Sequence, residues 1–232
     1  MSHEPAAAPV GVVLLNTRFP RLLGDIGNPA SFDRPVLYRR VPAATVGAVV
    51  RAEGVEGPLA EAILAAAEAL VAEGAAVIAT SCGFLGELQD RLAAALPVPV
   101  AASALALLPR IRADLRTRQG PAARIGVLTF DSRRLKPLHF AGHWSDDLVV
   151  EGLERGRELF PVITEDRETL DRAAAEQDVA EAAQRLLARA GRLDAVVLEC
   201  TNIGPYAERV RSVTGAAVHD LVGSLRAGPA TT

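Results

Sequence analysis

Two cysteines carry the side chains best suited to chemistry, and each follows an apolar run that is typical of a buried strand. Cys82 comes shortly after residues 76–80 (AVIAT), and Cys200 shortly after residues 194–198 (DAVVL). Ligands of parallel α/β sheets bind beyond the carboxyl ends of the strands, where helix N-termini supply unpaired N–H groups. Such surroundings lower a thiol pKa below the ~8.5 of a free cysteine. We therefore expect two reactive thiols that serve as proton acceptors or nucleophiles.

Simpler explanations exist for each of these features. A cysteine is often a small buried apolar side chain, although two of them at matching strand ends favour a functional role. A disulfide between the two thiols is compatible with their positions but is disfavoured in a reducing compartment. His139 and His143 are spaced for one helix face but lack a third metal ligand at a suitable spacing, so we expect a solvated or half-buried pair. Glu151 and His219 are further pocket candidates, for which a structural role is favoured.

A polar loop after the first apolar run supplies more candidates. Residues 16–35 hold several Gly and Asn residues and three prolines, a composition that predicts a long structured loop of functional importance. Arg21 or Arg18 in this loop can clamp a substrate carboxylate with two N–H groups, or can lie on the surface without a function. Asp25 and Asn28 are expected mainly to shape the turns.

The composition excludes several classes of protein. The chain has 25 basic and 28 acidic side chains and a pI near 5.9, whereas a dedicated nucleic-acid binder usually has a basic excess. Two cysteines are too few for a disulfide scaffold in 232 residues. No apolar run reaches the ~18 residues of a membrane span, and residues 1–9 lack the pattern of a secretory signal. We therefore expect a cytoplasmic protein that binds neither nucleic acid nor a membrane.

Apolar runs alternate with helical patterns along the whole chain, and this alternation predicts the fold class. Strands are expected at residues 10–15, 36–41, 76–80, 98–101, 124–129, 148–150, 194–198 and 216–219. Helices are expected at residues 58–73, 85–96, 104–116 and 205–213 and from residue 220 onward, and a helical region, in which one break is left open, at about residues 165–191. Strands that alternate with helices form parallel sheets with helices on both faces, so the fold class is α/β.

The chain also contains an internal repeat. The segment VGVVLLNT is similar to RIGVLTFD, which places Gly11 opposite Gly126, 115 residues later. The segment AVIATSCG is similar to AVVLECTN, which places Cys82 opposite Cys200, 118 residues later. Two similar offsets predict two pseudo-symmetric lobes with a thiol in each and an active site between them. The expected lobes are residues 1–121 and 122–232, with the final helix packing back on the N-terminal lobe.

The two similar halves, with TSCG around Cys82 and ECTN around Cys200, resemble the aspartate/glutamate racemase superfamily. This group of cofactor-independent enzymes includes glutamate, aspartate and hydantoin racemases, arylmalonate decarboxylase and maleate isomerase. The resemblance covers nearly the whole chain. The sequence departs from the family at Gly83, where Asn is usual, and at Glu199, where Gly is common; the loop of residues 18–31 also differs from that of glutamate racemase. These departures leave the substrate open.

The resemblance implies a site and an activity. Cys82 and Cys200 are its implied catalytic pair, and neither a metal nor another cofactor is implied. Together with Arg21 of the polar loop, the expected substrate-binding residues are Asn16, Thr17, Ser81, Gly83, Thr201 and Asn202. The implied reaction is racemisation or epimerisation of a small α-substituted carboxylate, with an amino acid as the leading candidate. One cysteine removes the α-proton as a thiolate and the other returns a proton to the opposite face.

Two alternatives to racemisation remain open. One is decarboxylation or cis–trans isomerisation of a small diacid through a single cysteine. The other is a non-catalytic protein that binds a ligand with the same fold. The expected partner in each case is a small-molecule carboxylate. Dimers are common in the superfamily, so a homodimer is also left open.

Overall fold

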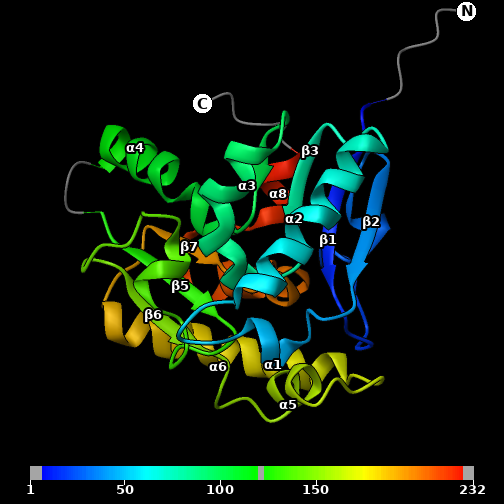
Figure 1. The fold of residues 1–232 in the computed structure, drawn as a ribbon. Coiled ribbons are helices and arrows are strands. Elements are labelled where there is room, and N and C mark those ends of the chain that lie inside the picture. Colours follow the sequence, from blue (N-terminus) through cyan, green and yellow to red (C-terminus); the bar gives the residue numbers. More distant parts are fainter. Residues whose placement is uncertain (1–6, 120–122, 227–232) are drawn as a thin grey trace, which may run out of the picture.

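The computed structural model describes residues 7–119 and 123–226 and contains two four-stranded parallel sheets, one from each half of the sequence (Figure 1). The first sheet has the order β2-β1-β3-β4 and the second the order β6-β5-β7-β8. The strands of the first sheet are β1 (Val10–Leu15), β2 (Val36–Val41), β3 (Val77–Thr80) and β4 (Val100–Ala101). Those of the second are β5 (Ile125–Thr129), β6 (Val149–Gly152), β7 (Ala195–Leu198) and β8 (Ala217–His219). The matching strand orders confirm the predicted α/β class and agree with the internal repeat.

Helices connect the strands of each sheet and pack against them. The α-helices are α1 (Val46–Val49), α2 (Gly57–Ala72), α3 (Gln89–Ala95), α4 (Leu108–Gln119), α5 (Leu159–Thr164), α6 (Arg172–Ala190), α7 (Ala207–Thr214) and α8 (Leu221–Arg226). The 3-10 helices are η1 (Pro29–Ser31), η2 (Gly83–Leu88), η3 (Ala104–Leu107), η4 (Pro137–Phe140) and η5 (Thr201–Tyr206). Helix α2 packs on the first sheet and α6 on the second. The expected boundary between the lobes falls on residues 120–122, which lie outside the described residues.

The two glycines that the repeat aligns occupy equivalent places in the two sheets. A Cβ atom on Gly11 in β1 would lie 2.7 Å from Ile78 Cδ1 and 3.1 Å from Leu70 Cβ of α2. A Cβ atom on Gly126 in β5 would lie 2.8 Å from Leu186 Cδ2 of α6. Both glycines therefore allow a helix to approach the central strand of its sheet closely. This shared packing explains why the sequence similarity includes a glycine.

The central strands bring their carboxyl ends together in each lobe. Strand β1 pairs in parallel with β2 and β3, and β5 pairs in parallel with β6 and β7. All residues of β3, β5 and β7 are buried, which accounts for their uninterrupted apolar runs. The residues that follow β3 and β7 therefore emerge beside the ends of β1 and β5. Helix α1 of the first half lies beside α5 of the second half at this end of the molecule (Figure 1).

The predicted helix over residues 165–191 is wrong in its first part. Helix α6 begins only at Arg172, because the Asp171 carboxylate accepts hydrogen bonds from the N–H groups of Ala173 and Ala174 and so caps the helix there. Asp166 has φ near 53°, in the left-handed region, and cannot continue a helix. A separate short helix, α5, precedes this turn.

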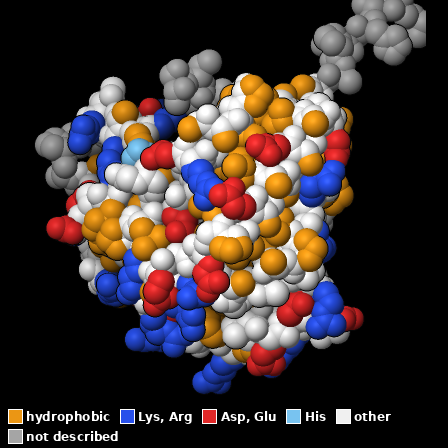
Figure 2. Space-filling model, in the orientation of Figure 1, with side chains coloured by type: hydrophobic (Ala, Val, Ile, Leu, Met, Phe, Trp, Pro, Cys, Tyr) orange, Lys and Arg blue, Asp and Glu red, His pale blue; other side chains and the backbone are white. Residues whose placement is uncertain are grey.

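The distribution of charged side chains on the surface agrees with the similar numbers of acidic and basic residues in the sequence. On the face that Figure 2 shows, acidic and basic side chains lie interspersed, with basic side chains gathered at the lower left. Within residues 7–119 and 123–226, no helix combines the length and the apolar character that crossing a membrane requires.

Candidate functional site

Both cysteines lie at the N-terminus of a 3-10 helix and line one small cavity between the lobes. Cys82 is the N-cap residue of η2, and Cys200 is the N-cap residue of η5. The backbone N–H of Phe84 points at the sulfur of Cys82, and that of Asn202 points at the sulfur of Cys200. The cavity has a volume of about 20 Å³ and both thiols are free. The structure thus brings together the two residues that the repeat pairs.

The electrostatics of the thiols differ from the sequence-based expectation of lowered pKa values. Burial raises the pKa of Cys82 to about 12 and that of Cys200 well above its usual value. The nearby carboxyl of Glu199 adds to both shifts, while the N–H groups of Phe84 and Asn202 oppose them only in part. The expectation was wrong because two short 3-10 turns do not offset the loss of hydration.

The loop after β1 forms one wall of the cavity through an ion pair. Arg21 Nη1 lies 3.1 Å from Asp25 Oδ1, and Arg21 Nη2 donates to Thr17 Oγ1 at 2.9 Å. Asp25 is buried, and its Oδ2 accepts a hydrogen bond of 2.8 Å from Asn202 Nδ2 in the other lobe. The Arg21 guanidinium also lies over the Phe19 ring, 4.4 Å from its centroid. Asp25 does more than shape a turn, because it joins the loop to η5.

The predicted substrate-binding residues fall into two groups. Arg21, Ser81, Gly83 and Asn202 line the cavity with the thiols. The other three do not line the cavity. Asn16 is exposed and donates a hydrogen bond to the Pro42 carbonyl, and Thr17 accepts one from Arg21. Thr201 donates a hydrogen bond of 3.0 Å to the Ser81 carbonyl. Thr201 therefore joins the two walls of the site, Thr17 holds Arg21 in place, and Asn16 contacts Pro42.

Gly83 is required by the close approach of the two lobes. A Cβ atom at this position would lie 2.3 Å from both the carbonyl oxygen and Oε1 of Glu199. We expect Gly83→Ala to lower the free energy of unfolding by about 1–3 kcal/mol, because one lobe must shift away from the other. Urea unfolding followed by circular dichroism measures this change.

Gly57→Ala is the matched control for that substitution. No atom lies within 4 Å of a Cβ at Gly57, the first residue of α2, so the control is expected to keep or slightly raise stability. Equal stabilities for the two variants would contradict the proposed contact between Gly83 and Glu199.

Sequence reasoning missed several residues of the cavity. Glu199 lines it, although the sequence showed this residue only as a departure from the racemase pattern. A charged residue directly after a buried strand and directly before a candidate catalytic cysteine was the available signal. The apolar walls come from Leu15, Phe19, Val46, Val50, Phe84, Phe130 and Ile163. These residues belong to separate segments of both lobes, and no local pattern connects them.

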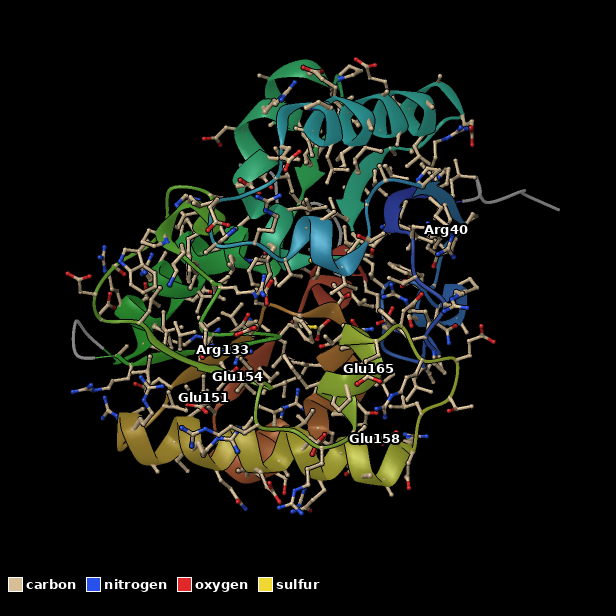
Figure 3. The ribbon with its side chains drawn as sticks, turned by 60° about the horizontal axis from the view of Figure 1, so that its bottom comes forward. Arg40, Arg133, Glu151, Glu154, Glu158 and Glu165 are labelled. Carbon is tan, nitrogen blue, oxygen red and sulfur yellow. The ribbon has the colours of Figure 1, made fainter. Side chains whose placement is uncertain are left out.

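Other candidate residues lie in structural contacts. Glu151 forms ion pairs with Arg185 and Arg189 of α6, and Figure 3 shows it beside that helix. Arg18 pairs with Asp166 and Glu168 of the other lobe. Neither Glu151 nor Arg18 lines the cavity.

The histidines do not form the expected solvated or half-buried pair, because His139 is fully buried. The two ring nitrogens of His139 are hydrogen-bonded to backbone atoms of Lys136 and Arg51. Within the part of the chain that the structure describes, no group of three or more His, Cys, Asp and Glu side chains is arranged to hold a metal ion.

Comparison with solved structures shows the fold. Unliganded arylmalonate decarboxylase aligns with a TM-score of 0.60 and 16% identity, covering 97% of this chain and 94% of the other. Glutamate racemase from Francisella tularensis, solved with D-glutamate, aligns with a TM-score of 0.55 and 14% identity, covering 93% and 76%. These neighbours confirm the fold of the aspartate/glutamate racemase superfamily. No protein-family model matches the chain.

Comparison with curated sequences corrects the expected activity. A dimethylsulfoniopropionate lyase from Durusdinium sp. clade D is 30% identical over 222 residues, covering 93% of this chain and 72% of the relative. Dimethylsulfoniopropionate lyase 7 from Emiliania huxleyi is 28% identical, covering 93% of this chain and 64% of the relative. The chain thus spans somewhat less than two thirds of the Emiliania huxleyi lyase.

These relatives are lyases, so the expectation of a racemase, and of an isomerase in general, was wrong. The alternative of decarboxylation or cis–trans isomerisation of a small diacid through one cysteine agrees better with them, because decarboxylation is also a lyase reaction. By sequence the chain belongs to the family of the Durusdinium dimethylsulfoniopropionate lyase, and it has the fold of the aspartate/glutamate racemase superfamily.

Proposed function

We propose that this protein is a lyase that removes a neutral leaving group from the β-carbon of a small cationic carboxylate, with dimethylsulfoniopropionate as the leading substrate. The observation that carries the proposal is that two free thiols and three phenylalanine rings line the same cavity between the lobes. The thiols supply a base, and the rings supply a surface suited to a cation with methyl groups. The lyase relatives favour this reaction over racemisation at the same cavity.

The reaction needs one base and a good leaving group. A cysteine thiolate removes the proton from the carbon next to the carboxylate. The C–H electron pair forms the carbon–carbon double bond, and the C–S bond breaks with its electron pair on sulfur. The products are acrylate, neutral dimethyl sulfide and a proton that the thiol later releases to solvent. This sequence of steps draws only on side chains of the protein and needs no cofactor.

The aromatic walls suit a sulfonium group. Phe19, Phe84 and Phe130 line the cavity, although the whole chain has only six phenylalanines. Aromatic faces attract cations, and the attraction grows when water is excluded. The Arg21 guanidinium already uses one face of Phe19, so Phe84 and Phe130 are the better candidates for contacting the substrate.

The raised thiol pKa values also favour a cationic substrate. With the pKa of Cys82 at about 12 and that of Cys200 well above its usual value, few thiolates exist in the free protein at neutral pH. A positive charge bound beside a thiol favours its ionised form and so lowers its pKa. The substrate therefore helps to generate the base that attacks it, and a neutral analogue lacks this effect.

Proton NMR tests the proposal directly. Incubation of the protein with dimethylsulfoniopropionate is expected to produce vinyl signals of acrylate, with an equal amount of dimethyl sulfide by gas chromatography. The neutral analogue 3-(methylthio)propionate is expected to remain intact. Acrylate formation no faster than in a sample without protein would refute the proposed substrate, and equal turnover of the neutral analogue would refute the role of the cation.

A further inference from the structure

One oxygen of the Glu199 carboxyl group has no partner. Glu199 is 1% exposed, and its Oε2 accepts hydrogen bonds from Thr129 Oγ1 at 2.6 Å and from the Phe130 N–H at 3.4 Å. The other oxygen, Oε1, is buried and makes no hydrogen bond to any residue within 7–119 and 123–226. Buried polar atoms are nearly always hydrogen-bonded, so an unpartnered carboxyl oxygen beside a cavity indicates a place for a ligand group.

The pseudo-symmetry shows which part of Glu199 is structural. Ser81 precedes Cys82 as Glu199 precedes Cys200, and Ser81 Oγ accepts the Leu15 N–H at 3.0 Å. This bond is the counterpart of the Phe130 N–H bond to Glu199 Oε2, because both hold the end of a first strand. A serine performs this task with a single oxygen. Glu199 performs it with Oε2, so Oε1 is not needed for this structural role.

The free oxygen occupies the space of a missing side chain in the opposite lobe. Thr201 follows Cys200, but only Gly83 follows Cys82. A Cβ on Gly83 would lie 2.3 Å from Glu199 Oε1, so the glutamate from one lobe fills the place of a side chain in the other. Both residues line the cavity with the thiols. The pairing of Glu199 with Gly83 therefore delivers a carboxyl oxygen to the cavity wall next to Cys82.

The surrounding charges favour a neutral Glu199. The other ionisable side chains lining the cavity are Cys82, Cys200 and Arg21, and Arg21 is paired with Asp25. Because the charge of Arg21 is balanced by Asp25, an ionised Glu199 would leave an uncompensated negative charge, which raises the thiol pKa values and repels an anionic ligand. Burial raises the pKa of Glu199 to about 7, so the protonated form is available at neutral pH.

Groups slightly farther from the cavity complete the electrostatic surroundings of Glu199. On the β5 side, Asp131 is paired with Arg133 and Arg134. On the η2 side, Glu87 accepts the Val55 N–H and raises the pKa of Cys82. These carboxyl groups are held by their own partners, so we expect Glu199 to respond most strongly to charge inside the cavity.

The hydrogen bonds at Oε2 favour Oε1 as the oxygen that holds the proton. The Phe130 N–H can only donate, so Oε2 serves as an acceptor. A proton on Oε1 leaves both hydrogen bonds accepted by Oε2 in place, and Oε1, which lies against Gly83 in the cavity wall, is then the hydrogen-bond donor.

We propose that Glu199 binds the carboxylate of the substrate through a hydrogen bond donated by its protonated Oε1. This inference rests on the proposed function for the identity of the ligand as a small carboxylate. The bond strengthens as the α-proton leaves, because negative charge then develops on the substrate carboxylate. Glu199 keeps its proton throughout: the α-proton moves to the thiolate, and the electron pair of the C–S bond leaves with sulfur.

The proposal fixes the sign of the pH dependence of binding. Below pH 7, Glu199 is already protonated in the free protein, so carboxylate affinity is insensitive to pH. Above pH 7, the ligand binds together with a proton, and the dissociation constant rises about tenfold per pH unit. The thiols contribute no such linkage below pH 9, because their raised pKa values keep them protonated over this range.

Propionate, which has no leaving group, is the probe for the test. Isothermal titration calorimetry from pH 5.5 to 9, in buffers of different ionisation enthalpy, measures the affinity and the protons taken up. The wild type is expected to take up about one proton per propionate near pH 9. Glu199→Gln keeps a donor at this position, so it is expected to bind within about tenfold of the wild type at pH 6, with neither proton uptake nor pH dependence. Glu199→Met has no donor and is expected to bind more weakly than either.

Each outcome separates this inference from the proposed function. Proton uptake by the Gln variant equal to that of the wild type would refute the role of Glu199. If the wild type binds no propionate, or binds it without taking up a proton, the role of Glu199 is also refuted. This result needs no variant, so it holds even if the variants do not fold. Cleavage of dimethylsulfoniopropionate is measured separately. Propionate binding that is coupled to proton uptake, without any cleavage, would support the role of Glu199 and refute only the proposed lyase activity.

Discussion

The double variant Cys82→Ala/Cys200→Ala is expected to lose β-elimination of dimethylsulfoniopropionate, with kcat falling by about 10²–10⁴-fold. Both thiols line the cavity, and among its other lining residues only Arg21 and Glu199 are ionisable. Arg21 remains charged, and Glu199 is proposed to act as a donor, so neither replaces the base. The initial rate of acrylate formation, followed by NMR, measures the loss.

The two single variants separate elimination from two-base chemistry. Elimination requires one base, so one of Cys82→Ala and Cys200→Ala is expected to lose nearly all activity while the other keeps a measurable fraction. Unequal burial also distinguishes the thiols, because Cys82 is partly exposed and Cys200 is buried. Equal losses would indicate that both thiols act on the substrate, and activity in the double variant would exclude a cysteine base.

Arg21→Met is expected to lower the free energy of unfolding by about 3–5 kcal/mol, because it leaves the Asp25 carboxylate buried without its ionic partner. Arg21 and Asp25 are 15% and 1% exposed. Methionine preserves much of the apolar contact with Phe19, so the loss reports mainly on charge. Burial already raises the pKa of Asp25 against the effect of Arg21, and removal of Arg21 raises it further.

Arg39→Met is the matched control for that variant. Arg39 pairs with Glu73 on the surface, where both side chains are more than 40% exposed, so its loss is expected to cost less than about 1 kcal/mol. Adding Asp25→Asn to Arg21→Met is expected to recover part of the stability, because the unpaired charge is then absent. Equal urea unfolding curves for Arg21→Met and Arg39→Met would refute the ion pair as a structural element.

The strands could be predicted because buried parallel strands have an unmistakable composition. The expected ranges 10–15 and 36–41 are those of β1 and β2, and the other strands differ by one to two residues at their ends. The start of α6 could not be placed as well. The cap at Asp171 and the left-handed turn at Asp166 depend on local backbone geometry that the helical periodicity of residues 165–191 conceals.

The site could be predicted only where a local signal exists. A cysteine after a strand is visible in the sequence, and so the thiol pair was found. The Phe19, Phe84 and Phe130 walls come from three separate segments, and their convergence depends on how the two lobes meet. Burial, which reverses the expected direction of the thiol pKa shifts, is likewise a property of the assembled cavity.

The identity of the reaction could not be read from the thiols for a chemical reason. Racemisation and β-elimination from a carboxylate begin with the same step, removal of the proton next to the carboxylate. The residues around the thiols are proposed to serve that shared step. What happens next depends on whether the substrate carries a leaving group, which is a property of the ligand. Two cysteines therefore predict the first step but not the product.

The size of the cavity has a kinetic consequence. Its volume of about 20 Å³ is close to that of a single small molecule such as water and too small for an eight-atom substrate such as dimethylsulfoniopropionate. Hydrogen bonds from Thr201 to Ser81 and from Asn202 to Asp25 hold its two walls together, as does the exposed ion pair of Arg18 with Asp166. If the protein is the proposed lyase, its substrate can enter and acrylate can leave only when these walls move apart, and the contacts between the walls would then set how long a bound molecule stays.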